Sequence, residues 1–167
     1  DKILNELKEN GVSIIENYLD KQDLNEIEQS LLDTLNYIDS DNEKDLKKKY
    51  FKIKSSHPKL KSNWYDLSAY NTEMFRFTHS DQIINLVKKF FNANVVFSGR
   101  PAIHVHDHDN DFLLEAHQET KQYARDFFLF WLPLWDTNFE NGGLTIYKNS
   151  HKRGYFEHSI DATPEKK

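Results

Sequence analysis

The sequence predicts a single α+β domain in which helices come first and a β-sandwich or β-barrel follows. Two observations lead to this prediction. Apolar residues recur at helical spacing up to about residue 93, and from residue 94 onward short apolar runs alternate with turn residues. No helical pattern separates those later runs, which disfavours a doubly wound α/β fold. We therefore expect residues 1–93 to be mainly helical and residues 94–167 to supply the strands.

The helical half is expected to open with a strand and a long amphipathic helix. Residues 11–15 predict a short strand that begins at a glycine. Asp20 is a candidate N-cap, because its side chain can accept a hydrogen bond from a free amide of the first helical turn. The helix after it would bury one apolar face. That face comprises Leu24, Ile27, Leu31 and Leu35.

Two further helices are predicted before the strands begin. A more charged helix is expected from about residue 42 to residue 54, whereas the mixed composition of residues 58–70 predicts irregular structure. Ser80 or Asp81 can cap the last helix. Its apolar face would comprise Ile84, Val87, Phe90 and Phe91.

The second half reads as a succession of strands. Turn residues at 98–101, 107–110 and 141–143 separate its apolar runs. The predicted strands are residues 95–97, 102–106, 112–117, 127–135 and 144–147.

The composition excludes several classes of function. The chain has 167 residues, a net charge of −5 and no cysteine, so disulfides, zinc-thiolate sites and cysteine nucleophiles are excluded. The net charge gives no general attraction to nucleic acid or to an anionic membrane. The lysine run 47–49 lies beside Glu43 and Asp45, and we expect it to form a solvated helix face. Since no apolar run reaches the roughly 20 residues of a membrane span, we expect a cytoplasmic protein.

The motif with the clearest chemistry is His117-Gln118-Glu119. Residues two apart in a strand point to the same face, so His117 and Glu119 would project together. One imidazole and one carboxylate are two ligands of the facial triad that binds Fe(II) with open coordination positions. By itself the His-x-Glu spacing is weak, because it occurs by chance in many proteins.

The residues around this motif resemble the phytanoyl-CoA dioxygenase family. In that family a His-Gln-Asp ligand pair precedes an apolar strand that ends in an acidic residue, as in 126–136 here. An Asn-Gly-x-Leu turn and a Ser-His-Lys-x-Gly segment follow, as in 141–144 and 149–154. Residues 11–19 and the helix after them are also similar to the opening of the family.

The resemblance implies a double-stranded β-helix (a cupin-like jelly roll), with N-terminal helices packed on one sheet. It also implies a 2-oxoglutarate-dependent dioxygenase that uses Fe(II), 2-oxoglutarate and O₂ to hydroxylate a small or carrier-linked organic substrate. His117 and Glu119 occupy the ligand positions, with glutamate where the family usually has aspartate. No catalytic residue beyond the metal ligands is expected. The family's second histidine ligand and its 2-oxoglutarate-binding arginine lie beyond the Ser-His-Lys segment, so residues 1–167 are expected to be a C-terminally incomplete oxygenase domain.

Three other residues are candidates for binding 2-oxoglutarate. Related enzymes place a basic or polar residue on the strands before the ligand pair, which favours Arg100 and His104; His106 shares a face with His104, and we favour His104. Tyr123 follows the ligands and is placed to lean over the mouth of the site. The alternatives stay open: the histidines would form a surface cluster among acidic residues, and Tyr123 would be a packed or rim aromatic.

Rival metal sites also exist in the run 104–109, which reads His-Val-His-Asp-His-Asp. It departs from the metallo-hydrolase His-x-His-x-Asp-His pattern at its last two ligand positions. It partly matches a cupin His-x-His motif, but Glu115 is spaced too far along. Neither reading explains the segments that follow Glu119.

Two hypotheses from different classes therefore remain. The first is an oxygenase acting on a small molecule, without nucleic acid or membrane as a partner. The second is a non-catalytic jelly-roll binding module whose metal site is degenerate or incomplete, which Glu119 and the missing second histidine favour. The sequence specifies neither the substrate nor the oligomeric state.

Overall fold

The computed structural model describes residues 2–96, 99–105, 116–118 and 127–156. The chain divides into two compact units. The first, called the split unit below, consists of Asp1–Ile14 and His106–Lys167. The second, Ile15–Val105, is called the helical unit. Each unit is a separate body and is described by itself.

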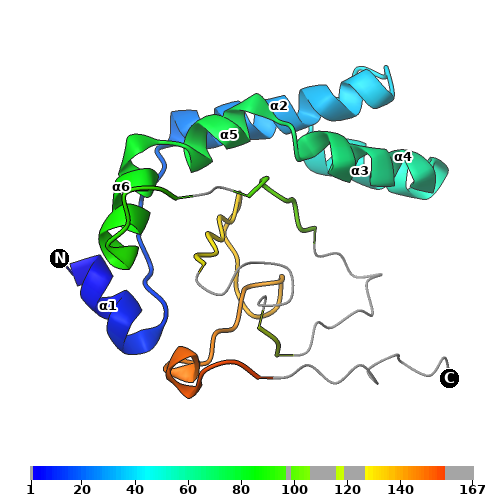
Figure 1. Ribbon diagram of the computed structural model, residues 1–167. Coiled ribbons are helices and arrows are strands. Elements are labelled where there is room, and N and C mark those ends of the chain that lie inside the picture. Colours follow the sequence, from blue (N-terminus) through cyan, green and yellow to red (C-terminus); the bar gives the residue numbers. More distant parts are fainter. Residues whose placement is uncertain (1, 97–98, 106–115, 119–126, 157–167) are drawn as a thin grey trace, which may run out of the picture. The chain divides into compact units, whose positions relative to one another are not determined.

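The helices of the helical unit are joined by short connections (Figure 1), and the described residues that follow the last helix, 92–96 and 99–105, are not helical. The longest helix, α2, contacts α3, α4 and α5, and α3 also contacts α4. In chain order the helices are α2 (Lys21–Ile38), α3 (Leu46–Ser56), α4 (Pro58–Ser68), α5 (Thr72–Thr78) and α6 (Asp81–Phe91).

The core of the helical unit lies where α2, α3 and α4 meet. Leu31 and Leu35 of α2, Ile53 of α3 and Trp64 of α4 are each at most 2 % exposed. The indole N–H of Trp64 donates to the Leu31 carbonyl at 3.2 Å, so the one polar atom of this side chain is satisfied inside the core. The predicted apolar face of α2 is thus confirmed at Ile27, Leu31 and Leu35.

Side-chain caps stand at the starts of α2, α3, α5 and α6, but not at the start of α4. The side chains of Asp20, Asp45, Asn71 and Ser80 each accept a hydrogen bond from the backbone N–H three residues on, over 2.9–3.4 Å. The cap predicted at Asp20 is confirmed, and Ser80 caps the last helix while Asp81 is its first residue. These bonds satisfy amides that have no partner within the helix.

The prediction of irregular structure at 58–70 was wrong, because residues 58–68 form α4. Pro58 lies in the first turn, where a residue without an N–H is tolerated and its fixed φ suits the helix. The helix then buries Trp64 and Ser68, four residues apart on one face. A proline at the start and an apolar residue in the middle were the signals available for this helix.

The predicted jelly-roll core is contradicted by the structure. None of the residues that the structure describes is in a β-strand, so neither a double-stranded β-helix nor a sheet beneath the helices is present there. Residues 11–15, 127–135 and 144–147 are described in full and are coil or bends. The apolar face of α2 is covered by α3, α4 and α5, where a sheet had been expected.

The predicted strands are absent because alternating apolar residues with high β-propensity form a strand only when a second strand is present to pair with them. Three consecutive apolar residues are exposed to solvent: Leu129 (57 %), Phe130 (40 %) and Trp131 (39 %). Odd- and even-numbered positions are therefore both exposed, whereas a strand on a core would bury one of the two sets. Without a neighbouring strand to accept its backbone hydrogen bonds, a run of apolar residues does not become a strand.

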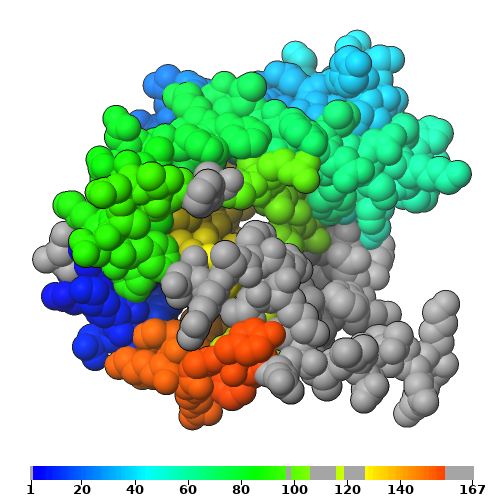
Figure 2. All heavy atoms as spheres, viewed as in Figure 1, coloured from blue at the N-terminus to red at the C-terminus, as the bar shows by residue number. Residues whose placement is uncertain are grey.

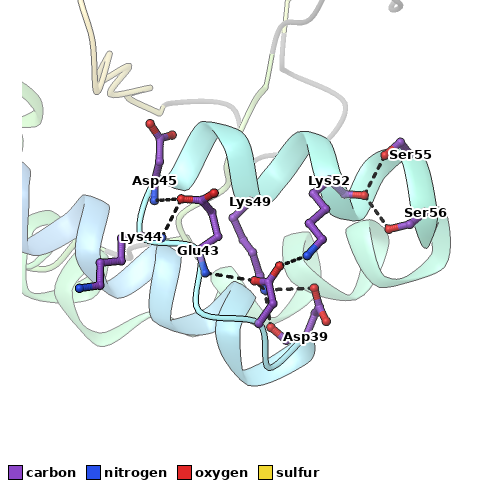
Figure 3. A network of polar contacts seen from close by, with 9 residues as sticks. Asp39, Glu43, Lys44, Asp45, Lys49, Lys52, Ser55 and Ser56 are labelled. Atoms are coloured by element: carbon purple, nitrogen blue, oxygen red, sulfur yellow. Dashed lines mark hydrogen bonds and ion pairs between the residues drawn. The ribbon is translucent and has the colours of Figure 1, made fainter.

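The lysine run 47–49 was also predicted wrongly in part, since Lys49 is fully buried. Its ammonium donates to the Asp39 carbonyl at 2.5 Å and to the Asp39 carboxylate at 3.0 Å, and it pairs with Asp41 (Figure 3). Lys52 also pairs with Asp41. The hydrogen bonds from Lys49 and then Lys52 hold the pKa of Asp41 well below its usual range. The loop between α2 and α3 is thereby tied onto α3.

In the described part of the split unit, the helices are α1 (Lys2–Asn10) and the 3₁₀ turn η2 (Ser150–Arg153). No described residue of this unit is fully buried. In neither unit does a described helix combine the length and the apolarity that a bilayer crossing requires.

Candidate functional site

The predicted ligand His117 lies in the split unit, in the short described stretch 116–118, which is neither helix nor strand. Ala116 and His117 are exposed, whereas Gln118 is half-buried. The three consecutive side chains therefore do not share one environment. His117 is exposed to solvent, and Gln118 is partly covered.

The Gln118 amide forms a two-point contact that we call the Gln118 clamp. Its Nε2 donates to the Gly154 carbonyl at 2.9 Å, and its Oε1 accepts from the Phe156 N–H at 2.9 Å. One side chain thus satisfies both a backbone acceptor and a backbone donor, as a neighbouring strand would. The clamp joins the residue beside His117 to the end of the Ser-His-Lys segment, 36 residues away along the chain.

The Ser-His-Lys segment is held at its other end by α1. The last carbonyls of a helix lack partners within it, and two of them in α1 are satisfied by this segment. The His151 Nε2 lies 3.0 Å from the Lys8 carbonyl, and since a carbonyl can only accept, Nε2 carries the proton. The Asn149 N–H donates to the Asn10 carbonyl at 2.9 Å. Figure 2 shows the segment that contains η2 (orange) beside the N-terminal helix (blue).

Two glycines make this arrangement possible. Gly11 caps α1 with a φ of +77°, and a Cβ there would lie 2.4 Å from the His151 Nδ1. Gly154 has φ +78° and ψ −157°, a combination that is essentially restricted to glycine. A Cβ on Gly154 would meet nothing within 4 Å. Gly11 is therefore required for space as well as conformation, and Gly154 for conformation alone.

Arg100 and His104, predicted to bind 2-oxoglutarate, are exposed residues of the helical unit. The Arg100 guanidinium lies over the Tyr70 ring, 5.1 Å from its centroid, and its Nη1 donates to the Tyr70 hydroxyl at 2.5 Å. This cation–π contact and hydrogen bond orient the guanidinium. Tyr70 was not singled out from the sequence, because nothing in its pattern indicates a partner 30 residues away.

Several predicted site residues lie outside the described residues. They are Glu119, Tyr123 and His106. Within the described stretches, no three histidine, aspartate or glutamate side chains gather into a group that would hold a metal ion. The assignments of His117 and Glu119 to a metal and of Arg100, His104 and Tyr123 to 2-oxoglutarate stay predictions.

Gln118 lies between the two predicted ligands, and its place in the sequence alone indicates no role for it. A signal was present in Gly154, since a glycine directly after a short turn often marks a positive φ. The partner of that turn could not be read from the sequence, because the clamp is a contact between side chain and backbone across 36 residues.

The chain was compared with known protein families, curated proteins and solved structures. A model of the family described as phytanoyl-CoA dioxygenase (PhyH) matches residues 7–167. No curated protein and no solved structure matches. The family match spans the helical unit, the Gln118 clamp and the Ser-His-Lys segment, and it confirms the resemblance found in the sequence. The chain therefore belongs to the phytanoyl-CoA dioxygenase family, which is generally a family of 2-oxoglutarate-dependent dioxygenases that use Fe(II).

Proposed function

We propose that this chain acts as an Fe(II)- and 2-oxoglutarate-dependent dioxygenase that hydroxylates a small or carrier-linked organic substrate. The observation that carries the proposal is the family match over residues 7–167, which includes the His117-Gln118-Glu119 motif. Membership of the family supplies the reaction class, and the motif supplies two donors of the kind that Fe(II) binds.

His117 and Glu119 would hold the metal. The exposed imidazole of His117 is compatible with this role, because a ligand must reach an ion that substrate and O₂ also approach. Glu119 contributes a hard carboxylate oxygen on a side chain one methylene longer than aspartate. Bound Fe(II) supplies the site at which 2-oxoglutarate and O₂ react, while the protein orients them and excludes water.

Arg100, His104 and Tyr123 are the proposed residues for 2-oxoglutarate. A guanidinium suits a carboxylate because it can donate two parallel hydrogen bonds. Of the three, Arg100 has a described partner, the exposed Tyr70, which holds one edge of the guanidinium. The substrate is proposed to be a small molecule and neither a nucleic acid nor a membrane, in keeping with the net charge of −5.

The proposal is tested by anaerobic titration of the purified protein with Fe(II) and then 2-oxoglutarate, followed by visible absorption. A new charge-transfer band is expected in the wild type, because 2-oxoglutarate would chelate the bound metal. The band should vanish in His117→Ala and Glu119→Ala. His104→Ala should keep Fe(II) binding and require more 2-oxoglutarate to develop the band.

The matched control is His57→Ala, which removes an exposed imidazole of the helical unit that makes no cap hydrogen bond. This variant should develop the same band as the wild type. A wild type that develops no band would contradict a working oxygenase site within residues 1–167 and favour a non-catalytic binding module. Loss of metal binding in His104→Ala but not in Glu119→Ala would indicate a cupin-type site.

A further inference from the structure

We propose that Gln118 is a positioning residue for His117: the Gln118 clamp fixes the peptide from which the metal-binding imidazole projects. The inference rests on the proposed function, because it takes His117 to be a metal ligand. It goes beyond that function by assigning a role to a side chain that would itself touch neither metal nor substrate.

The first observation is the difference in exposure between adjacent residues. A polar amide normally stays in water, yet Gln118 is half-buried while Ala116 and His117 beside it are exposed. Both polar atoms of the amide are engaged, in two hydrogen bonds of 2.9 Å to backbone groups. Because the Gln118 side chain is held at both polar atoms, rotation of the peptide that precedes it is restricted.

The second observation is that the partner of the clamp is anchored independently. Gly154 directly follows η2, and η2 is tied to the end of α1 through His151 and Asn149. Lys152 adds an ion pair with Glu9 at 3.4 Å. The amide of Gln118 therefore binds a backbone segment that a helix end already holds in place, and not a freely moving loop.

The third observation is the backbone conformation of Gly154. Its φ of +78° occurs although a Cβ would meet no atom within 4 Å, so packing does not explain the glycine. We infer that this backbone conformation directs the Gly154 carbonyl and the Phe156 N–H toward the same partner, the Gln118 side-chain amide. The glycine thus shapes the receiving end of the clamp.

Partners that orient a metal ligand from behind typically change metal affinity by about 10- to 100-fold when they are removed. We therefore expect Gln118→Ala to weaken binding of Fe(II), and of Co(II) as a spectroscopic substitute, by about 10- to 100-fold. The visible bands of bound Co(II) should also shift, because they report ligand geometry. In the metal-free protein the Phe156 amide should exchange its hydrogen faster, since its acceptor is gone.

Two more variants separate positioning from folding. Gln118→Glu keeps the oxygen that accepts from the Phe156 N–H but replaces the donor to the Gly154 carbonyl with a second oxygen. One of the two hydrogen bonds is thereby lost, so we expect a metal affinity between those of the wild type and Gln118→Ala. Gly154→Ala leaves Gln118 untouched and disturbs only the backbone that it holds, so metal affinity should fall in the same direction. As a control, Gln29→Ala removes an exposed hydrogen bond from a glutamine side chain to Asp33 in the helical unit. This variant should change neither the metal affinity nor the visible bands of bound Co(II).

The outcomes distinguish this inference from the proposed function. If the wild type binds neither Fe(II) nor Co(II), the proposed function fails and the positioning role fails with it. If Gln118→Ala binds both metals like the wild type, with unchanged Co(II) bands and a faster Phe156 amide, only the positioning role is overturned. Should Gln118→Ala not fold, Gly154→Ala decides, and unchanged metal affinity in that variant overturns the inference.

Discussion

The two units of this chain are stabilised in different ways. In the helical unit, apolar side chains from successive helices bury one another, and every fully buried apolar residue among those described lies there. In the described part of the split unit no residue is fully buried, and hydrogen bonds such as that of His151 with Lys8 join segments that are distant in the sequence. Buried apolar packing is therefore concentrated in the helical unit, whereas directed hydrogen bonds join distant segments in the described part of the split unit.

The largest difference is expected when a tryptophan is truncated in each unit. Trp64→Ala removes a side chain that is 2 % exposed, together with its bond to Leu31, and should lower the free energy of unfolding by about 3–5 kcal/mol. Trp131→Ala removes one that is 39 % exposed and should lower the free energy of unfolding by less than Trp64→Ala does. Urea unfolding followed by circular dichroism at 222 nm measures both, and equal losses would contradict the comparison.

A smaller effect, with a characteristic pH dependence, is expected for the buried cation. Lys49→Met leaves Asp39 and Asp41 without their shared ammonium, and should destabilise the chain at pH 7 by less than Trp64→Ala. The pKa of Asp41 is lowered from 3.8 in the folded state, so its ionised form stabilises the fold above that pH. That stabilisation is lost as the pH falls through the lowered pKa.

The stability difference between wild type and Lys49→Met should therefore shrink as the pH falls below about 3.8. Denaturant unfolding at a series of pH values measures this difference. The matched control is Lys48→Met, an exposed neighbour on the same helix, which should show no comparable dependence. A constant difference for Lys49→Met across the acid range would mean that the ion pairs contribute nothing.

The smallest effect is expected at Gly11 in the split unit. Gly11→Ala places a Cβ within 2.4 Å of the His151 ring and imposes a φ of +77° on alanine, at a cost of about 1–2 kcal/mol. The His151 bond to Lys8 should break, and the Asn149 amide should exchange faster. In a double-mutant cycle with His151→Ala, the clash between the new Cβ and the imidazole disappears, while the backbone strain at residue 11 remains. The losses of stability from the two substitutions should therefore be less than additive. Full additivity would show that the ring and the glycine do not interact.

The same division explains what could be predicted from the sequence. Caps at Asp20 and Ser80 and the apolar face of α2 depend on residues a few positions apart, and these predictions were confirmed. The strands were predicted from alternation alone, which does not reveal whether a pairing segment is present, and the jelly roll was wrong for the described residues. Lys49 was misjudged because its acidic partners lie ten and eight residues away, outside the helix.

For the site, the family could be predicted because several motifs occur in a fixed order along the chain. The geometry could not be predicted. The Gln118 clamp and the contact of His151 with α1 join residues 36 and 143 positions apart, and no local pattern encodes such pairs. Arg100 likewise has a partner, Tyr70, that its neighbours in sequence do not indicate.

The burial of Lys49 gives the molecule an internal reporter of its own folding. Lys47, Lys48 and Lys49 are consecutive, yet the first two are exposed and the third is enclosed. An amine-acylating reagent should thus modify two adjacent sites in the native protein and the third only when α3 leaves the loop that precedes it. Because all three lie in one peptide, mass spectrometry of that peptide compares them directly, with the neighbours correcting for reagent and time. The rate at which the third amine reacts would measure how often this region opens.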